Sequence, residues 1–148
     1  MKKLLTAILF CVLTLGMASM AGAAEAKWQR ILENFMAADY KIFYETNSFK
    51  TTSNTTYSVL IKYSFPESEA VHMNKLVGWP LNAAYNLRTI HLNYKNKVFL
   101  QESSFDFYDK NDKFIKTVTI EDADWDIFGD FEAEIFKETF PYYDKHYR

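Results

Sequence analysis

Apolar and polar side chains alternate along much of the chain, which is the pattern of a β-strand with one buried face. Two alternating runs flank residues 109–112, where Asp and Asn can bond to their own backbone and tolerate left-handed torsion angles. The apolar residues of each run share one face: Phe99, Phe105 and Phe107 in the first, and Phe114, Val118 and Ile120 in the second. The sequence therefore predicts a β-hairpin, around which we expect the domain to be organised.

Three further segments are predicted as strands because their apolar residues recur at every second position. Residues 57–65 show the clearest pattern, with these residues on one face: Tyr57, Val59, Ile61, Tyr63 and Phe65. Residues 40–46 and 87–94 alternate in the same way. Residues 47–56 are mostly Ser, Thr, Asn and Lys, which predicts a turn-rich connection.

Residues 28–36 are ambiguous. Their apolar residues recur at helical spacing, whereas Trp28, Arg30 and Leu32 also alternate as they would in a strand. Periodicity alone favours a helix.

A short amphipathic helix is predicted near the C-terminus, with Asp130 as a suitable N-cap and Pro141 as its end. Its apolar stripe consists of Phe131, Ile135, Phe136 and Phe140. We expect Trp125 and Ile135 to pack in one core between this helix and the sheet. The predicted fold class is thus α+β and mainly β, a five- to six-stranded antiparallel sheet with the C-terminal helix packed on one face.

The longest connection, residues 67–84, contains a candidate binding site. Ser68 is a candidate cap for a short helical turn, and residues 78–80 (Gly-Trp-Pro) must break that turn. Met73, Leu76 and Trp79 form its most prominent apolar group. In one interpretation the loop folds over a sheet edge and completes the core. In the other, part of the group stays exposed and forms a contact patch.

The N-terminus has the order of a signal peptide: a basic start, an apolar segment at residues 4–15 and small residues around Ala23. We expect residues 1–23 to be removed and residues 24–148 to form a single exported domain. The only cysteine, Cys11, lies within the apolar segment, so the mature chain would contain no disulfide.

Charge and composition narrow the classes of partner. The net charge is −2 for the chain and becomes −4 once Lys2 and Lys3 are removed. With no basic stripe, this charge argues against nucleic-acid binding. No second apolar segment has membrane length, so we expect no integral membrane segment after cleavage. The 13 Phe and 10 Tyr against four Gly favour a sheet with a packed aromatic face.

The residues that could carry chemistry match no recognised catalytic or metal motif. The acidic run 122–130 lacks the glycine and glutamate of a calcium loop, which are replaced by Ile127 and Ala133. No serine lies in a glycine-flanked nucleophile elbow. The histidines fit no zinc spacing: they are His72, His91 and His146. We therefore expect neither an enzyme, nor a metal site, nor a cofactor.

Three short motifs resemble the surface-adhesin protein E family of small secreted bacterial proteins. Residues 44–48 (YETNS) resemble the end of an early strand in that family, and residues 103–113 resemble its hairpin, with Asp112 where Gly is usual. Trp125 and the two residues after it resemble a Trp corner before the C-terminal helix. The resemblance implies a strand at residues 28–33. It also implies that the partner is a host, matrix or envelope protein.

Two functions are consistent with these observations. The first is a non-enzymatic secreted or cell-envelope binding module that contacts a protein partner. The alternative is a periplasmic carrier of a small apolar ligand, held in a pocket between helix and sheet lined by Tyr57, Val59, Ile61 and Tyr63. An enclosed apolar cavity under the helix would distinguish the carrier from the binding module.

Overall fold

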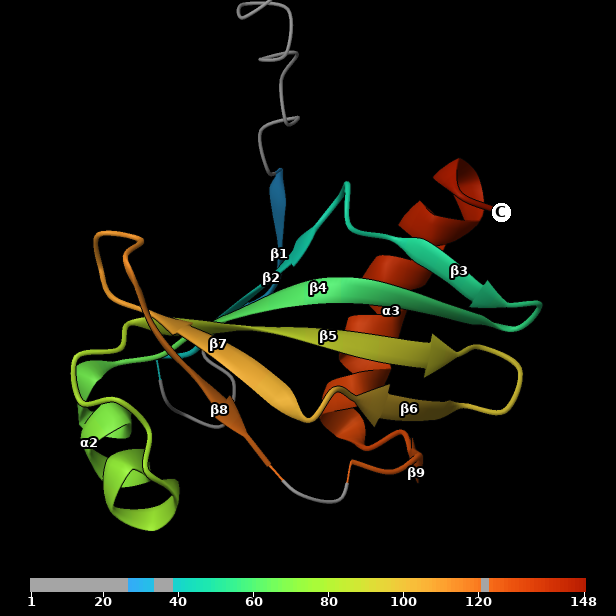
Figure 1. Cartoon of the computed structure of the whole chain (residues 1–148). Coiled ribbons are helices and arrows are strands. Elements are labelled where there is room, and N and C mark those ends of the chain that lie inside the picture. Colours follow the sequence, from blue (N-terminus) through green and yellow to red (C-terminus); the bar gives the residue numbers. More distant parts are fainter. Residues whose placement is uncertain (1–26, 34–38, 121–122) are drawn as a thin grey trace, which may run out of the picture.

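The computed structural model describes residues 27–33, 39–120 and 123–148. In this part of the chain it confirms the α+β, mainly β fold, with a nine-stranded antiparallel sheet and two helices (Figure 1). The elements are β1 (Trp28–Glu33), β2 (Lys41–Glu45), β3 (Lys50–Ser53), β4 (Thr56–Ser64), α2 (Glu67–Val77), β5 (Tyr85–Asn93), β6 (Val98–Gln101), β7 (Ser104–Tyr108), β8 (Phe114–Thr119), β9 (Asp126–Ile127) and α3 (Asp130–His146). The predicted signal peptide, residues 1–23, lies outside the described residues.

The two long strands β4 and β5 form the centre of the sheet. They pair over nine residues, from Thr56 opposite Asn93 to Ser64 opposite Tyr85. The outer edge of each long strand pairs with two shorter strands, one after the other along its length. Strands β3 and β2 pair with β4, and β6 and β7 pair with β5. Because β1, β8 and β9 extend these shorter partners, the sheet branches on both sides (Figure 1).

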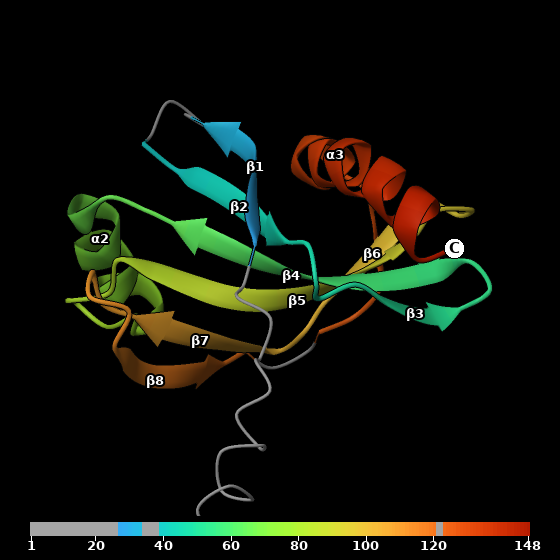
Figure 2. The same cartoon turned by 90° about the horizontal axis from the view of Figure 1, so that it is seen from above.

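One core fills the space between the sheet and α3, which crosses one face of the sheet (Figure 2). Its fully buried side chains include Ile42, Val59, Ile61, Leu92 and Ile135. The ring of Tyr57 stacks on that of Tyr143 with 4.4 Å between centroids. The Tyr57 hydroxyl lies 2.8 Å from the Thr139 hydroxyl, so the polar ends of both side chains are satisfied inside the core. The predicted packing of the helix on the sheet is thus confirmed, as is the burial of Ile135.

A second core lies at the α2 end of the sheet and contains Phe65, Ala70, Trp79, Ala83, Phe105 and Phe107. Arg88 joins the two cores, because its guanidinium carbon lies 4.3 Å from the ring centroid of Tyr63 and 4.4 Å from that of Phe105. The guanidinium also donates hydrogen bonds to the side-chain oxygens of Asn86 and Gln101. Burial lowers the pKa of Arg88 to about 10, which leaves this side chain cationic at neutral pH.

The sheet has more strands than the five or six expected, for two reasons. The run predicted as one strand, residues 98–107, is divided into β6 and β7, because the chain from Gln101 to Asp106 is longer than the stretch of β5 opposite it, Leu87 to Ile90. In addition, the short edge strands β3 and β9 lie in segments whose polar composition predicted connections. Both strands are short and all of their residues are exposed, so no alternation of apolar and polar residues marks them.

The C-terminal helix differs from its prediction at both ends. Gly129, not Asp130, is the N-cap, and its backbone N–H donates to the Glu132 carboxylate at 3.1 Å. The helix also continues through Pro141, which was expected to end it. Proline removes one backbone hydrogen bond, but the residues after it are held by packing, since Tyr143 is 1% exposed against the sheet.

The expectation that Trp125 packs with Ile135 is wrong. Trp125 is 46% exposed, and it lies just before β9 at the edge of the sheet. Aromatic residues of α3 itself occupy the space that Trp125 was expected to fill: Phe131, Phe136, Phe140 and Tyr142 pack against the first core.

Two local assignments are settled by tertiary contacts. Residues 28–33 form β1, as the resemblance implied and against the helical periodicity, because they pair with β2 from Trp28 opposite Glu45 to Glu33 opposite Lys41. The short helical turn expected after Ser68 is the complete helix α2, which begins earlier, at Glu67 after Pro66. Proline before the first turn suits a helix start because its missing N–H needs no partner there.

Residues 44–48, the first motif of the resemblance, join the sheet to α3. Glu45 accepts hydrogen bonds from the backbone of Asn47 and, through its own carbonyl, from the hydroxyl of Ser48. The same Ser48 oxygen accepts the N–H of Leu60 in β4 at 2.8 Å. The Thr46 carbonyl accepts the hydroxyl of Tyr147, just after α3. In this structure the motif therefore holds a sharp turn against both layers.

Asp112 offers a test of the β7–β8 turn, because its φ angle is +60° and its carboxylate accepts the Tyr85 hydroxyl at 2.9 Å. Asp112→Gly and Asp112→Ala both lose this hydrogen bond, but only alanine retains the steric cost of the left-handed torsion. We expect the alanine variant to be less stable than the glycine variant by ~1 kcal/mol in denaturant unfolding. Equal stabilities would contradict the left-handed turn.

The protein should lose stability at alkaline pH, because several of its tyrosines are buried and have a raised pKa. Burial is the largest cause of the raised pKa of Tyr57, Tyr63 and Tyr85, among others. Their protonated forms therefore contribute stability that is complete below about pH 10, the unfolded pKa, and is lost as pH rises further. The lowered pKa of Arg88 acts in the opposite direction but is a single group.

We expect the free energy of unfolding to fall steeply above about pH 10 as tyrosinate absorbance appears. The matched variant Tyr57→Phe should show a shallower fall, because one buried titrating group is removed. A free energy of unfolding that stays constant or rises in this range would contradict the packing of these rings.

Candidate functional site

The structure does not bring Met73, Leu76 and Trp79 together in one exposed patch. Trp79 is 8% exposed and its ring lies 5.0 Å from that of Phe65 and 5.1 Å from that of Phe107, measured between centroids. Met73 is partly buried against the same second core. Leu76, in contrast, is 64% exposed. The loop therefore completes a core with one part and leaves another part on the surface.

A tight turn after α2 produces this division. Gly78 ends the helix with φ +73°, and its N–H donates to the Asn74 carbonyl at 3.0 Å. This left-handed conformation suits glycine because it has no Cβ. The Asn74 amide then donates to the Trp79 carbonyl, and Lys116 of β8 donates to the Gly78 carbonyl at 3.0 Å. The chain thus turns sharply, with the indole directed into the core.

Three large aliphatic side chains are exposed around this turn, and we call them the α2 surface: Leu76, Val77 and Leu81. They are 64%, 52% and 55% exposed respectively. The sequence analysis selected Leu76 but not the other two. Helical spacing does place Leu76 on the surface, since it follows the buried Ala70 by six residues, roughly 240° around the helix. Val77 lies near the buried side of the helix by the same rule, and it is exposed because the second core ends before the last turn.

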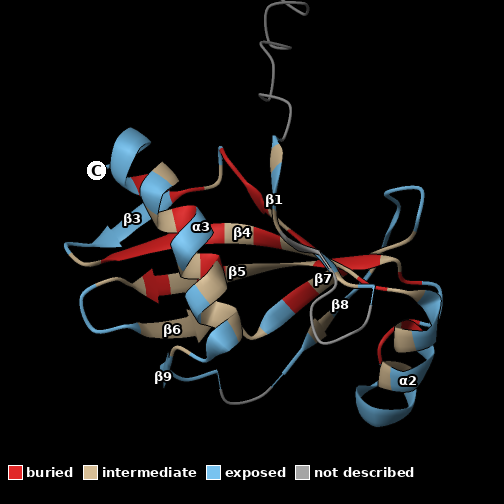
Figure 3. Cartoon of the chain, turned by 180° about the vertical axis from the view of Figure 1, so that it is seen from behind, coloured by how far each residue is buried: buried red, intermediate tan, exposed pale blue. Residues whose placement is uncertain are grey.

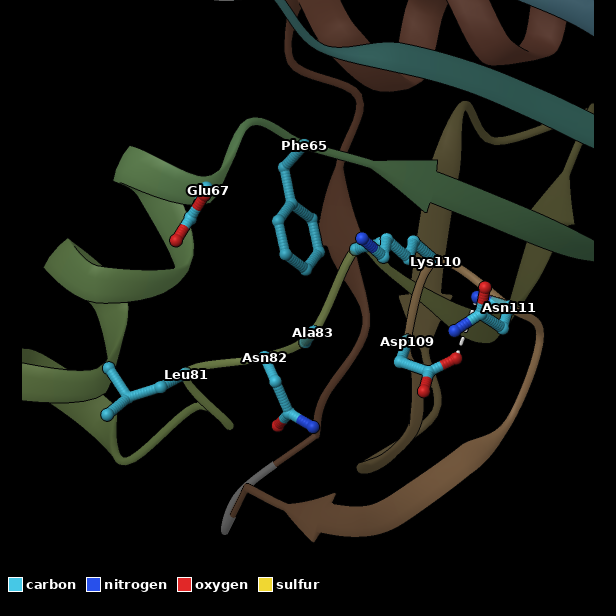
Figure 4. Close-up of a pocket in the computed structure, with 9 residues that line it drawn as sticks. Phe65, Glu67, Leu81, Asn82, Ala83, Asp109, Lys110 and Asn111 are labelled. Atoms are coloured by element: carbon cyan, nitrogen blue, oxygen red, sulfur yellow. Dashed lines mark hydrogen bonds between the residues drawn. The ribbon is translucent and has the colours of Figure 1, made fainter.

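A depression of about 360 Å³ adjoins Leu81 (Figure 4). Its residues come from the start of α2, the loop after α2 and the β7–β8 turn: Phe65, Glu67, Leu81, Asn82, Ala83, Ala84, Asp109, Lys110 and Asn111. Phe65, Leu81 and the two alanines supply apolar surface, while the other side chains supply carboxylate, amide and ammonium groups. The turn is held in place because Asp109 accepts the N–H groups of Asn111 and Lys113. Such a depression can receive an apolar side chain of a partner, while the polar groups at its rim form hydrogen bonds with that partner.

A second depression, of about 450 Å³, lies on the sheet over β3, β4 and β5, beside Glu102, which follows β6. It is mostly polar: Ser48, Lys50, Thr52, Ser58, Leu60, Thr89, His91 and Glu102 line it. His91 Nε2 lies 3.1 Å from Glu102 Oε1, and Ser58 is directly opposite His91 on the neighbouring strand. The hydroxyls of Ser48 and Thr52 already bond to backbone groups, so much of this surface is internally satisfied. We regard the His91–Glu102 pair as a cross-strand contact.

The residues that the carrier hypothesis assigned to a pocket are packed against α3. Val59 and Ile61 are 0% exposed, and Tyr57 stacks on Tyr143. Tyr63 contacts Phe131 at 5.3 Å between ring centroids. Helix and sheet side chains therefore occupy the position where the carrier alternative requires an apolar cavity.

Within the described residues, no three His, Cys, Asp or Glu side chains are grouped so that they could hold a metal ion. Neither α2 nor α3, the helices of the described part, is long and apolar enough to span a membrane. Comparison with protein-family models, curated proteins and solved structures found no match for this chain. The candidate site is accordingly argued from the geometry of the α2 surface.

Trp79 and Leu76 provide a matched test of the two sides of this turn. Removing the buried indole in Trp79→Ala should cost ~3–5 kcal/mol of stability, because it leaves a cavity against Phe65 and Phe107. Leu76→Ala should change stability by less than about 0.5 kcal/mol, since the side chain is exposed and alanine favours helix. Denaturant unfolding measures both. A stable Trp79→Ala protein would contradict the second core.

Proposed function

We propose that this protein is a non-enzymatic, exported binding module that contacts a protein partner through the α2 surface. The observation that supports the proposal most directly is the exposure of Leu76, Val77 and Leu81 within six residues of chain. Clustered aliphatic side chains in water are unfavourable for an isolated domain, and such patches mark interaction sites.

The backbone that carries these side chains is held in place, which suits a binding site. Trp79 is buried between the flanking aliphatic residues, and the turn is fixed by hydrogen bonds from Asn74 and Lys116. A partner would therefore meet side chains whose backbone is already ordered. Preordered contacts lose less conformational entropy on association, which leaves more of the contact energy as affinity.

The surroundings of the α2 surface match the anatomy of a protein interface. Leu81 continues into the depression, where Glu67, Asp109 and Lys110 surround the apolar surface of Phe65 (Figure 4). An apolar centre with a polar rim is typical of non-obligate interfaces. The signal peptide predicted from the sequence and the resemblance to surface-adhesin protein E support a partner among host, matrix or envelope proteins. They also support export to the periplasm, the medium or the cell surface.

The test compares binding by the wild type and by a Leu76→Ser/Leu81→Ser variant. Both proteins are immobilised and exposed to purified extracellular-matrix proteins and to envelope proteins of the producing cell. We expect at least one protein to bind the wild type and to bind the variant about tenfold or more weakly, because interface aliphatic groups are replaced. Melting temperatures should agree, since both positions are exposed.

Ile120→Ser is the matched control, because Ile120 is 39% exposed, lies just after β8 and is not part of the α2 surface. This control should bind the same partner as strongly as the wild type. Wild-type binding that survives the Leu76→Ser/Leu81→Ser change unaltered would exclude the α2 surface as the contact.

A further inference from the structure

A second exposed apolar group lies at the opposite end of the sheet from α2. Trp125 is 46% exposed and Ile127 is 73% exposed; we call these two residues the β9 patch. Strand β9 is the end of the strand order on this side, and its neighbour β6 pairs with it through Val98 opposite Ile127. Figure 3 shows β9 and the adjoining chain as exposed. Large apolar side chains on a free sheet edge require a physical reason, since edges are normally protected.

The chain around the β9 patch is strongly acidic. Residues 123–136, which the structure describes, contain five Asp and Glu and no Lys or Arg, whereas the whole chain has a net charge of only −2. In the described structure Asp124, Asp126 and Asp130 are exposed. Lys97 faces this region from the β5–β6 turn, but its ammonium lies 3.8 Å from the ring centroid of Phe136. The apolar patch is therefore surrounded by an excess of negative charge.

Three backbone N–H groups of this segment are already hydrogen-bonded. The N–H of Trp125 donates to the Asp124 carboxylate at 2.7 Å, and the N–H of Ile127 donates to the Asp126 carboxylate at 2.8 Å. The Phe128 N–H donates to the Lys97 carbonyl within the sheet. Because these three donors are occupied, they cannot also bond to an added strand, and the exposed side chains of Trp125 and Ile127 are the contact considered below.

We propose that the β9 patch is a second docking surface, and that its occupant is a cationic amphipathic segment of a partner protein. Apolar side chains of such a segment would cover Trp125 and Ile127, while its Lys or Arg groups would face the surrounding carboxylates. A cation can also lie over the indole face of Trp125. Charge complementarity of this kind accelerates association and excludes anionic partners.

Charge also decides between classes of occupant. Anionic lipid surfaces and nucleic acids carry the same sign as this segment and are repelled by it. An uncharged apolar partner would bury Asp124 and Asp126 without compensation, which is costly. A basic and apolar peptide satisfies both features of the surface. The proposal is independent of the α2 surface, which lies at the other end of the molecule (Figure 1).

The test uses a labelled synthetic peptide of alternating lysine and leucine, with fluorescence anisotropy as the readout. We expect the wild type to bind it, and a Trp125→Ala/Ile127→Ser variant to bind about tenfold or more weakly. Asp124→Asn/Asp126→Asn removes two charges but keeps the side-chain oxygens that accept the backbone N–H groups. This second variant should bind several-fold more weakly at low salt, and the difference should shrink as salt is added.

Leu76→Ser/Leu81→Ser is the matched control, because it removes exposed aliphatic groups from the α2 surface and should leave peptide binding unchanged. A peptide of alternating lysine and serine should bind much more weakly than the lysine–leucine peptide. The proposal is overturned if both peptides bind equally, or if the variants at the β9 patch bind like the wild type. Binding of the wild type to anionic lipid vesicles, lost in Trp125→Ala/Ile127→Ser, would also overturn it in favour of membrane contact.

Discussion

The nine-residue ladder between β4 and β5 is the interaction on which the rest of the structure depends. Its residues supply the sheet side of the first core and the edges to which β2, β3, β6 and β7 attach. At one end, the chain leads directly from β4 into Phe65 and from Ala83 towards β5, and both of these residues belong to the second core. The covering elements are distributed along its length, with α3 over one part and α2 near one end (Figure 2). Without this long ladder the short strands would have no continuous partner, since two-stranded pairs of their length are marginal in water.

The two cores meet at a junction on the sheet, between the ring of Tyr63 and the ring of Phe105. Arg88 fills this junction with a planar cation held between the two rings and hydrogen-bonded to Asn86 and Gln101. These partners are neutral, so their interaction with the guanidinium must offset the cost of removing a charge from water. The pKa of Arg88 is lowered because burial disfavours the charged form of its side chain. The two cores are thereby coupled.

The two proposed contact surfaces lie beyond the ends of these cores. Val77 ends α2, Leu81 lies between the buried Trp79 and Ala83, and Ile127 lies on β9, the last strand of the sheet order. Residues at such positions can change without loss of core packing, which leaves them available for recognition. Their surroundings differ: the α2 surface has a mixed polar rim, whereas exposed aspartates flank the two apolar residues of the β9 patch.

Alternation in the sequence was sufficient to predict β4, β5, the β7–β8 hairpin and the apolar stripe of α3, because a period of two or of 3.6 is imposed by burying one face. Polar segments such as β3 carry no such pattern, and only pairing with β4 makes them strands. Tertiary packing likewise decided that α3 continues through Pro141, because the buried Tyr143 beyond it outweighs the lost hydrogen bond. It also decided which tryptophan is buried. Trp79 and Trp125 are equally apolar in sequence, but only Trp79 has Phe65 and Phe107 beside it, and those neighbours come from distant parts of the chain.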